Sequence, residues 1–284
     1  MSAEFEAQRG RAFALAYRML GSAADAEDIV QEAWIRWQRV DAPIEHPAAW
    51  MTKVVTRLCL DQLKSARVRR ERYVGPWLPE PVVTPEDEID PETISLAFLL
   101  LLERLTPAER AVYLLRQVFD FDYPDIAGAL DRSEDAVRQL ASRARKHVDA
   151  GRPRFAADPD AHLRLLGTFM MALQTGDVAA MESVLTGDVK VITDGGGETR
   201  AARRVVEGRS NATRLFFGLA KRSGAGLRPE MRSVNGWPSV LMWDGDRLQS
   251  MLSIETDGRQ IASFHIVVNP SKLERLARES TPPA

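Results

Sequence analysis

The side chains whose types and spacing most clearly suggest chemistry are polar and basic residues along one helical face in the middle of the chain. Apolar residues at positions 137, 140, 144 and 148 define the opposite face, which we expect to be buried. From a helix in a major groove, such polar side chains reach base edges and phosphates. The exposed face, with the residue that caps the helix, comprises Ser133, Arg138, Gln139, Ser142, Arg143 and Lys146. A solvated charged face would give the same pattern, so both interpretations stay open on this stretch alone.

A second group of basic residues lies in a longer helical stretch at residues 48–72. Trp50 begins an apolar stripe there, and Thr52 and Thr56 lie beside it. The basic residues of the stretch are Lys53, Arg57, Lys64, Arg67, Arg69, Arg70 and Arg72. Phosphate contact combined with stacking on unpaired bases would use these residue types, and a solvated basic face is the alternative.

An acidic face is predicted on the preceding helix, residues 24–39. Its outward residues are Asp25, Glu27, Asp28, Gln31 and Glu32. The tryptophans Trp34 and Trp37 follow on the side that we expect to be buried. The pattern fits either a solvated helix face or a docking surface for a basic partner.

Enzymatic chemistry has weaker support in the sequence. The polar candidates in the second half of the chain are Asp194, Arg209, Trp237, Trp243 and His265. His265 lies in an apolar strand-like run, where a core histidine is the commoner finding, and no spacing pairs it with an aspartate. Since Cys59 is the single cysteine and no Cys/His cluster exists, we expect no disulfide, no metal ion and no cofactor.

Length and composition predict a soluble chain of two or three domains. The chain has 284 residues and a net charge of −2. Its longest uninterrupted apolar run, residues 96–102, is too short to span a membrane. Residues 1–17 lack the apolar core of a signal peptide. We therefore expect a cytoplasmic protein without a membrane partner.

The first half of the chain is predicted to be helical. The predicted helices are residues 5–20, 24–39, 48–72, 93–105, 106–119, 123–130 and 133–148. Residues 131–132 form a turn and Ser133 caps the next helix, which predicts a helix-turn-helix. Thr106 and Glu109 have the spacing of a capping box. Five prolines and several carboxylates make residues 73–92 a linker.

The second half is predicted to mix helices and strands. Helices are expected at residues 161–174, 178–185 and 210–221, and strands at 189–193, 227–234, 239–243, 248–256 and 260–268. The pairs Asn235-Gly236, Asp244-Gly245 and Asp257-Gly258 predict hairpin turns and hence an antiparallel meander. Helices followed by a curved sheet suggest an α+β cone with a pocket.

These elements give the following predicted boundaries. They are 1–72 for a first helical domain, 73–92 for the acidic linker, 93–150 for the helix-turn-helix domain, 151–157 for a second linker, 158–276 for the α+β domain and 277–284 for a disordered tail.

The helical half resembles an alternative sigma factor of bacterial RNA polymerase, of the extracytoplasmic-function (ECF) class of the sigma-70 family. Residues 25–37, DAEDIVQEAWIRW, resemble the region 2 helix that docks on the polymerase β′ clamp. Residues 47–71 resemble the helix that melts and reads the −10 promoter element, and residues 105–148 resemble region 4, which reads the −35 element. Only a linker separates the two regions, as in the ECF class.

The resemblance implies a transcription initiation factor and not an enzyme. Its partners would be promoter DNA and core RNA polymerase, through the β′ clamp and the β flap. The polymerase would contact Asp25, Glu27, Asp28, Gln31, Glu32 and Trp34. A loop at residues 40–47 would capture a flipped base, and the −10 contacts would be Asp41, His46, Trp50, Lys53, Thr56, Arg57 and Arg67. The six residues of the exposed face named first would read the −35 element.

The C-terminal part resembles a SnoaL-like domain of the NTF2-like superfamily, as found in the sigma-J-like subgroup of ECF factors. Three motifs carry this resemblance, WLPEP, DGGGE and NPSKL. Their residues are Trp77, Pro79, Pro81, Asp194, Gly195, Gly196, Gly197, Asn269, Pro270, Lys272 and Leu273. The resemblance implies that these residues form regulatory interdomain contacts, so that the domain controls sigma activity in cis and no separate anti-sigma factor is required.

Three residues depart from the family pattern. Glu198 stands where the subgroup has Lys, Ser271 where it has Asp, and Thr56 where many ECF factors have Asn. Two other interpretations stay open. The chain would be either a SnoaL-type enzyme or small-molecule sensor fused to a DNA-binding module, or a regulator that does not contact polymerase.

Overall fold

The computed structural model describes residues 2–71, 73–84, 93–151, 158–199, 201–223 and 226–280, without the side chains of residues 65–71, 151 and 223. The chain forms two compact units. The first contains Met1–Arg72 and Phe98–Arg152, and the second contains Tyr73–Ala97 and Pro153–Ala284. The segment predicted as an acidic linker therefore falls, where it is described, in the second unit.

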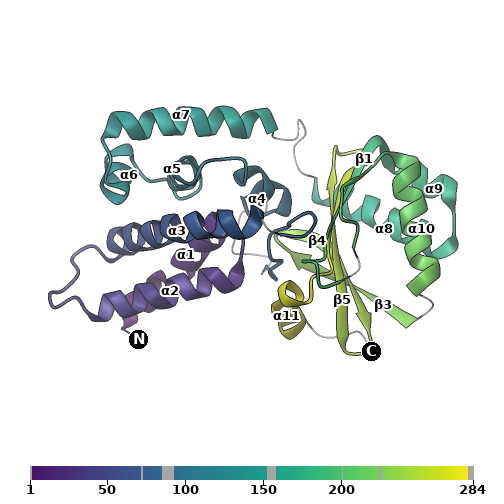
Figure 1. Ribbon diagram of the computed structural model, residues 1–284, viewed down its shortest axis with the longest axis horizontal. Helices are drawn as coiled ribbons and strands as arrows, with labels where there is room; N and C mark the ends of the chain where they lie inside the picture. Colours follow the sequence, from purple (N-terminus) through teal and green to yellow (C-terminus); the bar gives the residue numbers. More distant parts are fainter. Residues whose placement is uncertain are drawn as a thin grey trace. The chain divides into compact units, whose positions relative to one another are not determined.

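The first unit is helical, as predicted (Figure 1). Its helices are α1 (Ala3–Leu20), α2 (Ala23–Gln38), α3 (Pro47–Glu71), α5 (Pro107–Gln117), α6 (Tyr123–Leu130) and α7 (Glu134–Gly151), and α4 (Leu96–Leu102) crosses the boundary between the units. Local chemistry sets the helix ends. Gly21, with φ of 68°, ends α1, and the Ser22 hydroxyl accepts a hydrogen bond from Asp25 N at 3.2 Å to begin α2. The capping box of Thr106 and Glu109 at the start of α5 is confirmed.

Arginines join the early and late helices of the first unit. The side chain of Arg110 on α5 is 4% exposed, donates to Met19 O at 2.6 Å and pairs with Glu103 at 2.7 Å. Burial lowers the pKa of Arg110 to about 10. Arg11 on α1 donates to Phe119 O at 3.0 Å. Cys59 on α3 is fully buried, and burial raises the pKa of its thiol, as expected of a small core residue.

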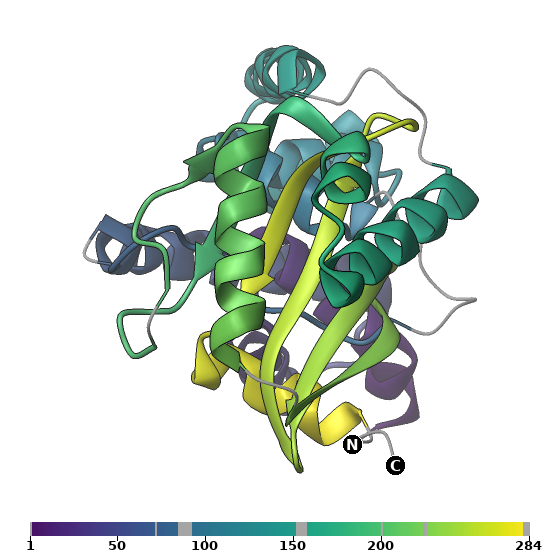
Figure 2. The same ribbon diagram turned by 90° about the vertical axis from the view of Figure 1, so that its right-hand side faces the viewer.

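The second unit is a six-stranded sheet with helices on both faces (Figure 2). Its strands are β1 (Leu185–Asp194), β2 (Val206–Glu207), β3 (Leu227–Val234), β4 (Trp237–Asp244), β5 (Arg247–Thr256) and β6 (Ile261–Val267), in the order β2-β1-β6-β5-β4-β3. The meander from β3 to β6 is antiparallel, as the hairpin signals predict, and Asn235 and Gly236 have φ of 52° and 77°. The pairing of β1 with β6 is parallel.

The core of the second unit lies between the sheet and three helices. These are α8 (Pro159–Thr175), α9 (Val178–Ser183) and α10 (Arg209–Ser223). Phe169 on α8, Phe216 on α10 and Phe264 on β6 meet with ring centroids 4.7–4.8 Å apart. Helix α11 (Pro270–Glu279) lies on the opposite side of the sheet and packs on β5 (Figure 1). The fold class is thus confirmed: two helical regions precede an α+β domain.

The end of the chain differs in part from the predicted tail. Helix α11 continues to Glu279, because Leu273 and Leu276 are buried and anchor it. Residues 281–284 lie outside the described part of the chain, as do residues 85–92 and 152–157 of the two predicted linkers. No described helix is both long enough and apolar enough to cross a membrane.

Candidate nucleic-acid interface and linker site

The helix-turn-helix of α6 and α7 has the geometry that its sequence predicts. Asp131 takes a left-handed conformation, with φ of 57°, to end α6. The Ser133 hydroxyl accepts from Ala136 N at 3.3 Å at the start of α7. Val137, Ala144 and Val148 are buried, as expected, whereas Leu140, predicted on the same face, is only half-buried. The six residues predicted to form the DNA-reading face are all exposed: Ser133, Arg138, Gln139, Ser142, Arg143 and Lys146.

The residues predicted to contact the −10 element surround the start of α3. Asp41, His46 and Lys53 are exposed, and Trp50 packs edge-on against Trp37 with ring centroids 5.2 Å apart. A groove of about 500 Å³ lies between the loop that precedes α3, the first turns of α3, and α6. Its lining includes His46, Trp50 and Lys53 from one side and Ile126 from the other.

Three further members of the −10 set are placed differently. Arg57 donates to Ala129 O at 3.0 Å and pairs with Asp131 at 3.4 Å, so the helix-turn-helix holds it. Thr56 is fully buried, and its hydroxyl has no hydrogen-bond partner among the described residues, so packing separates it from any solvent-side ligand. The side chain of Arg67 lies outside the described residues.

The acidic face of α2 is only partly exposed. Glu27, Asp28 and Gln31 are exposed. Asp25 accepts from Gln62 Nε2 at 3.1 Å, and Glu32 pairs with Arg36 at 2.9 Å. Trp34, which was predicted to contact polymerase, packs against Phe5 with ring centroids 4.9 Å apart. Its indole therefore also contributes to the packing of the first unit.

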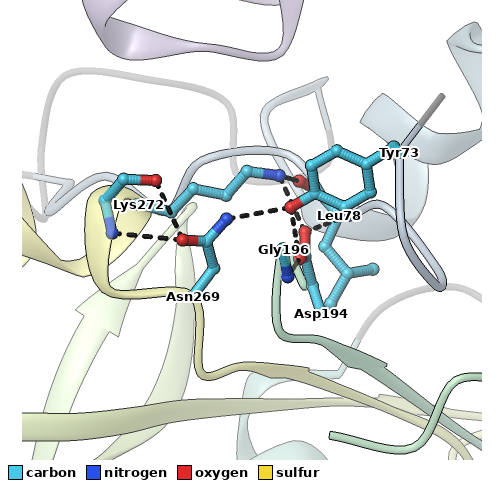
Figure 3. A network of polar contacts seen from close by, with 7 residues as sticks. Tyr73, Leu78, Asp194, Gly196, Asn269 and Lys272 are labelled. Carbon is cyan, nitrogen blue, oxygen red and sulfur yellow. Dashed lines mark hydrogen bonds and ion pairs between the residues drawn. The ribbon is translucent and has the colours of Figure 1, made fainter. Parts of the chain in front are cut away.

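A buried carboxylate, Asp194, organises a second site at the end of β1 (Figure 3). It accepts hydrogen bonds from the Tyr73 hydroxyl at 2.6 Å, Leu78 N at 2.8 Å and Gly196 N at 3.1 Å. Lys272 of α11 pairs with it at 2.7 Å. The side chain of Asp194 is 0% exposed, so four donors compensate a charge that water does not reach. Asp194 therefore joins the linker to the C-terminal helix.

Lys272 and Asn269 complete this linker site from the C-terminal side. Lys272 Nζ also donates to Leu78 O, and it lies 4.5 Å from the Trp77 ring centroid and 5.1 Å from that of Tyr73. Asn269 Nδ2 donates to the Tyr73 hydroxyl at 2.9 Å. Burial, followed by the hydrogen bond to Asp194, raises the pKa of Tyr73. The three sequence motifs thus meet in one polar network inside the second unit.

A second clamp holds the linker a few residues further on. Asn235, in the β3–β4 turn, accepts from Val82 N at 3.2 Å and donates through its side chain to Ile94 O at 2.9 Å. Thr84 N donates to Ser233 O at 3.3 Å, and Thr84 Oγ1 accepts from Gly236 N at 3.0 Å. The linker therefore pairs with the edge strand β3 through one isolated antiparallel β-bridge, between Val83 and Val234. Tyr73 and Asn235 were not predicted as site residues. The Asn235-Gly236 pair indicates only a turn, and Tyr73 lies outside the three motifs.

The glycines after Asp194 are explained by close approach. Gly196 has φ of +62°, and a β-carbon there would lie 2.8 Å from Asn269 Cγ. Gly197 has φ of +80°, and a β-carbon there would lie 3.1 Å from Val74 Cβ. Only glycine adopts these dihedrals without cost and leaves this space. Glu198, the departure from the family pattern, is exposed, and its charge contributes to the raised pKa of Tyr73.

Replacing Gly196 by alanine is expected to loosen the linker site. The new β-carbon would displace Asn269 and the positive φ would be strained, together costing about 1–3 kcal/mol. Thermal unfolding of the full chain should show a lower midpoint for Gly196→Ala. Gly187→Ala, on the strand β1 that precedes this loop, has no atom within 4 Å of the added carbon and should leave the midpoint unchanged. Equal midpoints for the two variants would contradict the close-approach explanation.

The candidates for enzymatic chemistry are dispersed or engaged. Asp194 is occupied by its four donors, and Trp243 Nε1 donates to Glu230 at 2.8 Å. Trp237 stacks on His162 with centroids 5.1 Å apart. Burial lowers the pKa of His265, against the opposing charge of Glu255. The Arg209 Nε atom is buried and has no hydrogen-bond partner in the described part of the chain. The structure pairs none of these residues with another as a nucleophile and a base.

The two helical regions of the chain match known protein families. Residues 5–69 match the family model of sigma-70 region 2, and residues 95–148 match that of sigma-70 region 4. The chain is similar to the ECF RNA polymerase sigma factor SigJ of Mycobacterium tuberculosis, with 45% identity over 82% of this chain and 78% of the relative. It is also similar to the probable ECF sigma factor SigI of that organism, with 33% identity over 98% of this chain and 97% of the relative.

A solved structure extends the likeness across both units. The crystal structure of the Mycobacterium tuberculosis extracytoplasmic function sigma factor SigJ matches with a TM-score of 0.77 and 38% identity. The match covers 95% of this chain and 97% of the other. The two helical regions, the α+β domain and their order along the chain are therefore shared with that factor. The chain belongs to the ECF sigma factors of the sigma-70 family, which direct promoter-specific transcription initiation.

Proposed function

We propose that the second unit controls the sigma activity of this chain in cis, by holding the segment that connects the two promoter-reading regions. The observation that carries the proposal is the buried carboxylate of Asp194, bonded at once to Tyr73 and Leu78 of the linker and to Lys272 of α11. Because the held segment leads from α3 to α4, its attachment fixes how much free chain lies between the two regions.

The length of this tether matters for reading two promoter elements together. Elements centred near −10 and −35 are about 25 base pairs apart, roughly 85 Å along B-DNA. Residues 73–84, when released, would add an extended reach of roughly 40 Å between the regions. Attachment to the second unit removes that reach. Control through this segment needs no separate anti-sigma factor.

The residue roles follow the exposed surfaces. The acidic face of α2 around Asp28 would bind the β′ clamp of core polymerase, and the α7 face would read the −35 element, with the β flap supporting region 4. The loop before α3, with Trp50 and Lys53, would bind the melted −10 strand. The protein would act in the cytoplasm, where transcription occurs. Arg57 would exchange Ala129 O and Asp131 for a phosphate. That exchange costs little, because its ion pair is 41% and 89% exposed.

Transcription in vitro with core polymerase tests the proposal directly. The full chain is compared with a truncation after Val268, which lacks Asn269 and Lys272, and a truncation after Arg152, which lacks the whole α+β domain. Losing the tail removes the Asn269 and Lys272 contacts and loosens the linker, so we expect several-fold more transcript. Losing the domain leaves the buried Leu78 and Val82 without partners, so we expect less transcript than from the full chain. Equal yields from all three would refute control in cis.

A further inference from the structure

Arg138 on α7 is the member of the DNA-reading face with the most defined surroundings. Its guanidinium carbon lies 4.4 Å from the ring centroid of Tyr123, the first residue of α6. Its Nε and Nη2 atoms both donate to Glu134 Oε1, one helical turn earlier, and the Nε distance is 3.1 Å. Its side chain is still 55% exposed. An exposed arginine is thus fixed by groups from both helices of the helix-turn-helix.

The ring of Tyr123 also contacts a second arginine, which lies on the preceding helix. The guanidinium carbon of Arg116, on α5, lies 5.4 Å from the same ring centroid. Arg116 Nη1 donates to Phe121 O at 3.2 Å and pairs with Asp120 at 3.4 Å. The α5–α6 loop therefore sets the position of Tyr123, which in turn offers a fixed aromatic face to Arg138.

The bonds to Glu134 select which edge of Arg138 remains available. A guanidinium carries five N–H donors. Glu134 occupies the side edge formed by Nε and one Nη2 proton, while the remaining Nη2 proton and one Nη1 proton form the end-on edge. Two parallel donors on that edge match O6 and N7 of guanine in the major groove. No other base offers two acceptors there in the same arrangement.

We propose that Tyr123 and Glu134 are positioning residues that hold Arg138 with its end-on edge free to read one guanine of the upstream promoter element. The inference rests on the proposed role of the α7 face and assigns it a base. Holding the guanidinium before binding removes rotamer freedom that the contact would otherwise have to restrict. Tyr123 acts through Arg138 and need not touch DNA itself.

Selection from a randomised template pool tests this inference with the full chain and core polymerase. The templates carry every base combination in the upstream element, and the transcripts are sequenced. Arg138→Ala should abolish a guanine preference at one position and spare the others. Tyr123→Leu should lower the guanine-over-adenine preference at that same position about fivefold, whereas Tyr123→Phe, which keeps the ring, should retain it. Adding Tyr123→Leu to Arg138→Ala should change the preference no further.

Two matched acidic residues extend the test. Glu134→Ala should relax the same preference about twofold, and Asp135→Ala, an exposed neighbour in the first turn of α7, should not. If Tyr123→Leu lowers transcript from all templates equally, with the guanine preference intact, its role is structural and the inference is overturned. If Arg138→Ala alters no position, Arg138 reads no base of the upstream element and the inference is overturned, whereas the proposed role of the α7 face still stands on its other residues.

Discussion

Replacing Asp194 by asparagine is expected to destabilise the second unit and to release residues 73–78, while the Asn235 clamp still holds Val82 and Thr84. The change keeps the volume of the side chain and removes its charge, so the buried ammonium of Lys272, 13% exposed, loses its counter-ion. Breaking a buried pair from one side costs about 3–5 kcal/mol. For a unit of this size that corresponds to a fall of about 6–20 °C in the unfolding midpoint. Among the variants considered, we expect this one to have the largest effect on stability.

Two measurements on Asp194→Asn separate linker release from general unfolding. Differential scanning calorimetry reports the midpoint, and chymotrypsin below that midpoint reports access to the aromatic residues Tyr73 and Trp77. Cleavage there should accelerate in the variant. Asp188→Asn, an exposed residue on the same strand, is the matched control and should behave as the parent chain does. A parent-like midpoint with parent-like cleavage would show that the network does not hold the linker.

Removing carboxylates from the acidic face of α2 is expected to have the largest effect on transcription. Asp28→Ala combined with Glu32→Ala should lower transcript about tenfold at limiting core polymerase, because two surface contacts of ~0.7 kcal/mol each amount to that factor. Both substitutions are compatible with the helix, since Asp28 is exposed and the pair of Glu32 with Arg36 is 42% and 47% exposed.

The competing interpretations of α2 differ in the outcome of this experiment. A regulator that does not contact polymerase would tolerate the double change. Glu6→Ala, an exposed carboxylate on α1, is the control and should leave transcription unchanged. Excess core polymerase should restore the yield of the double variant if binding alone is weakened. Full activity at limiting polymerase would exclude the docking role of this face.

The sequence predicted those features that local chemistry decides. The capping box of Thr106 and Glu109 needs only three residues of separation, and the Asn235-Gly236 turn needs only a pair that tolerates positive φ. The burial of Val137, Ala144 and Val148 followed from helical spacing alone. Each of these is fixed before distant parts of the chain meet.

The linker site was predicted only in outline, because tertiary packing decides its partners. Motif resemblance placed Asp194 and Lys272 in one regulatory set, but their ion pair joins residues 78 positions apart, and the Tyr73 bond to Asp194 spans 121. No local pattern announces either contact. Thr56 was predicted to contact DNA because it is polar, but the packing of α3 buries it completely. Burial of this kind also depends on tertiary packing and not on a local pattern.

Control of sigma activity in cis through the linker can be measured by transcription with the full-length Asp194→Asn chain. The measurement compares transcript per promoter-bound polymerase with that of the parent chain and of Asp188→Asn, at a temperature where all three are folded. Control in cis predicts a several-fold rise for Asp194→Asn alone, accompanied by faster chymotrypsin cleavage near Tyr73. Unchanged transcription from a chain whose linker is demonstrably released would contradict the claim.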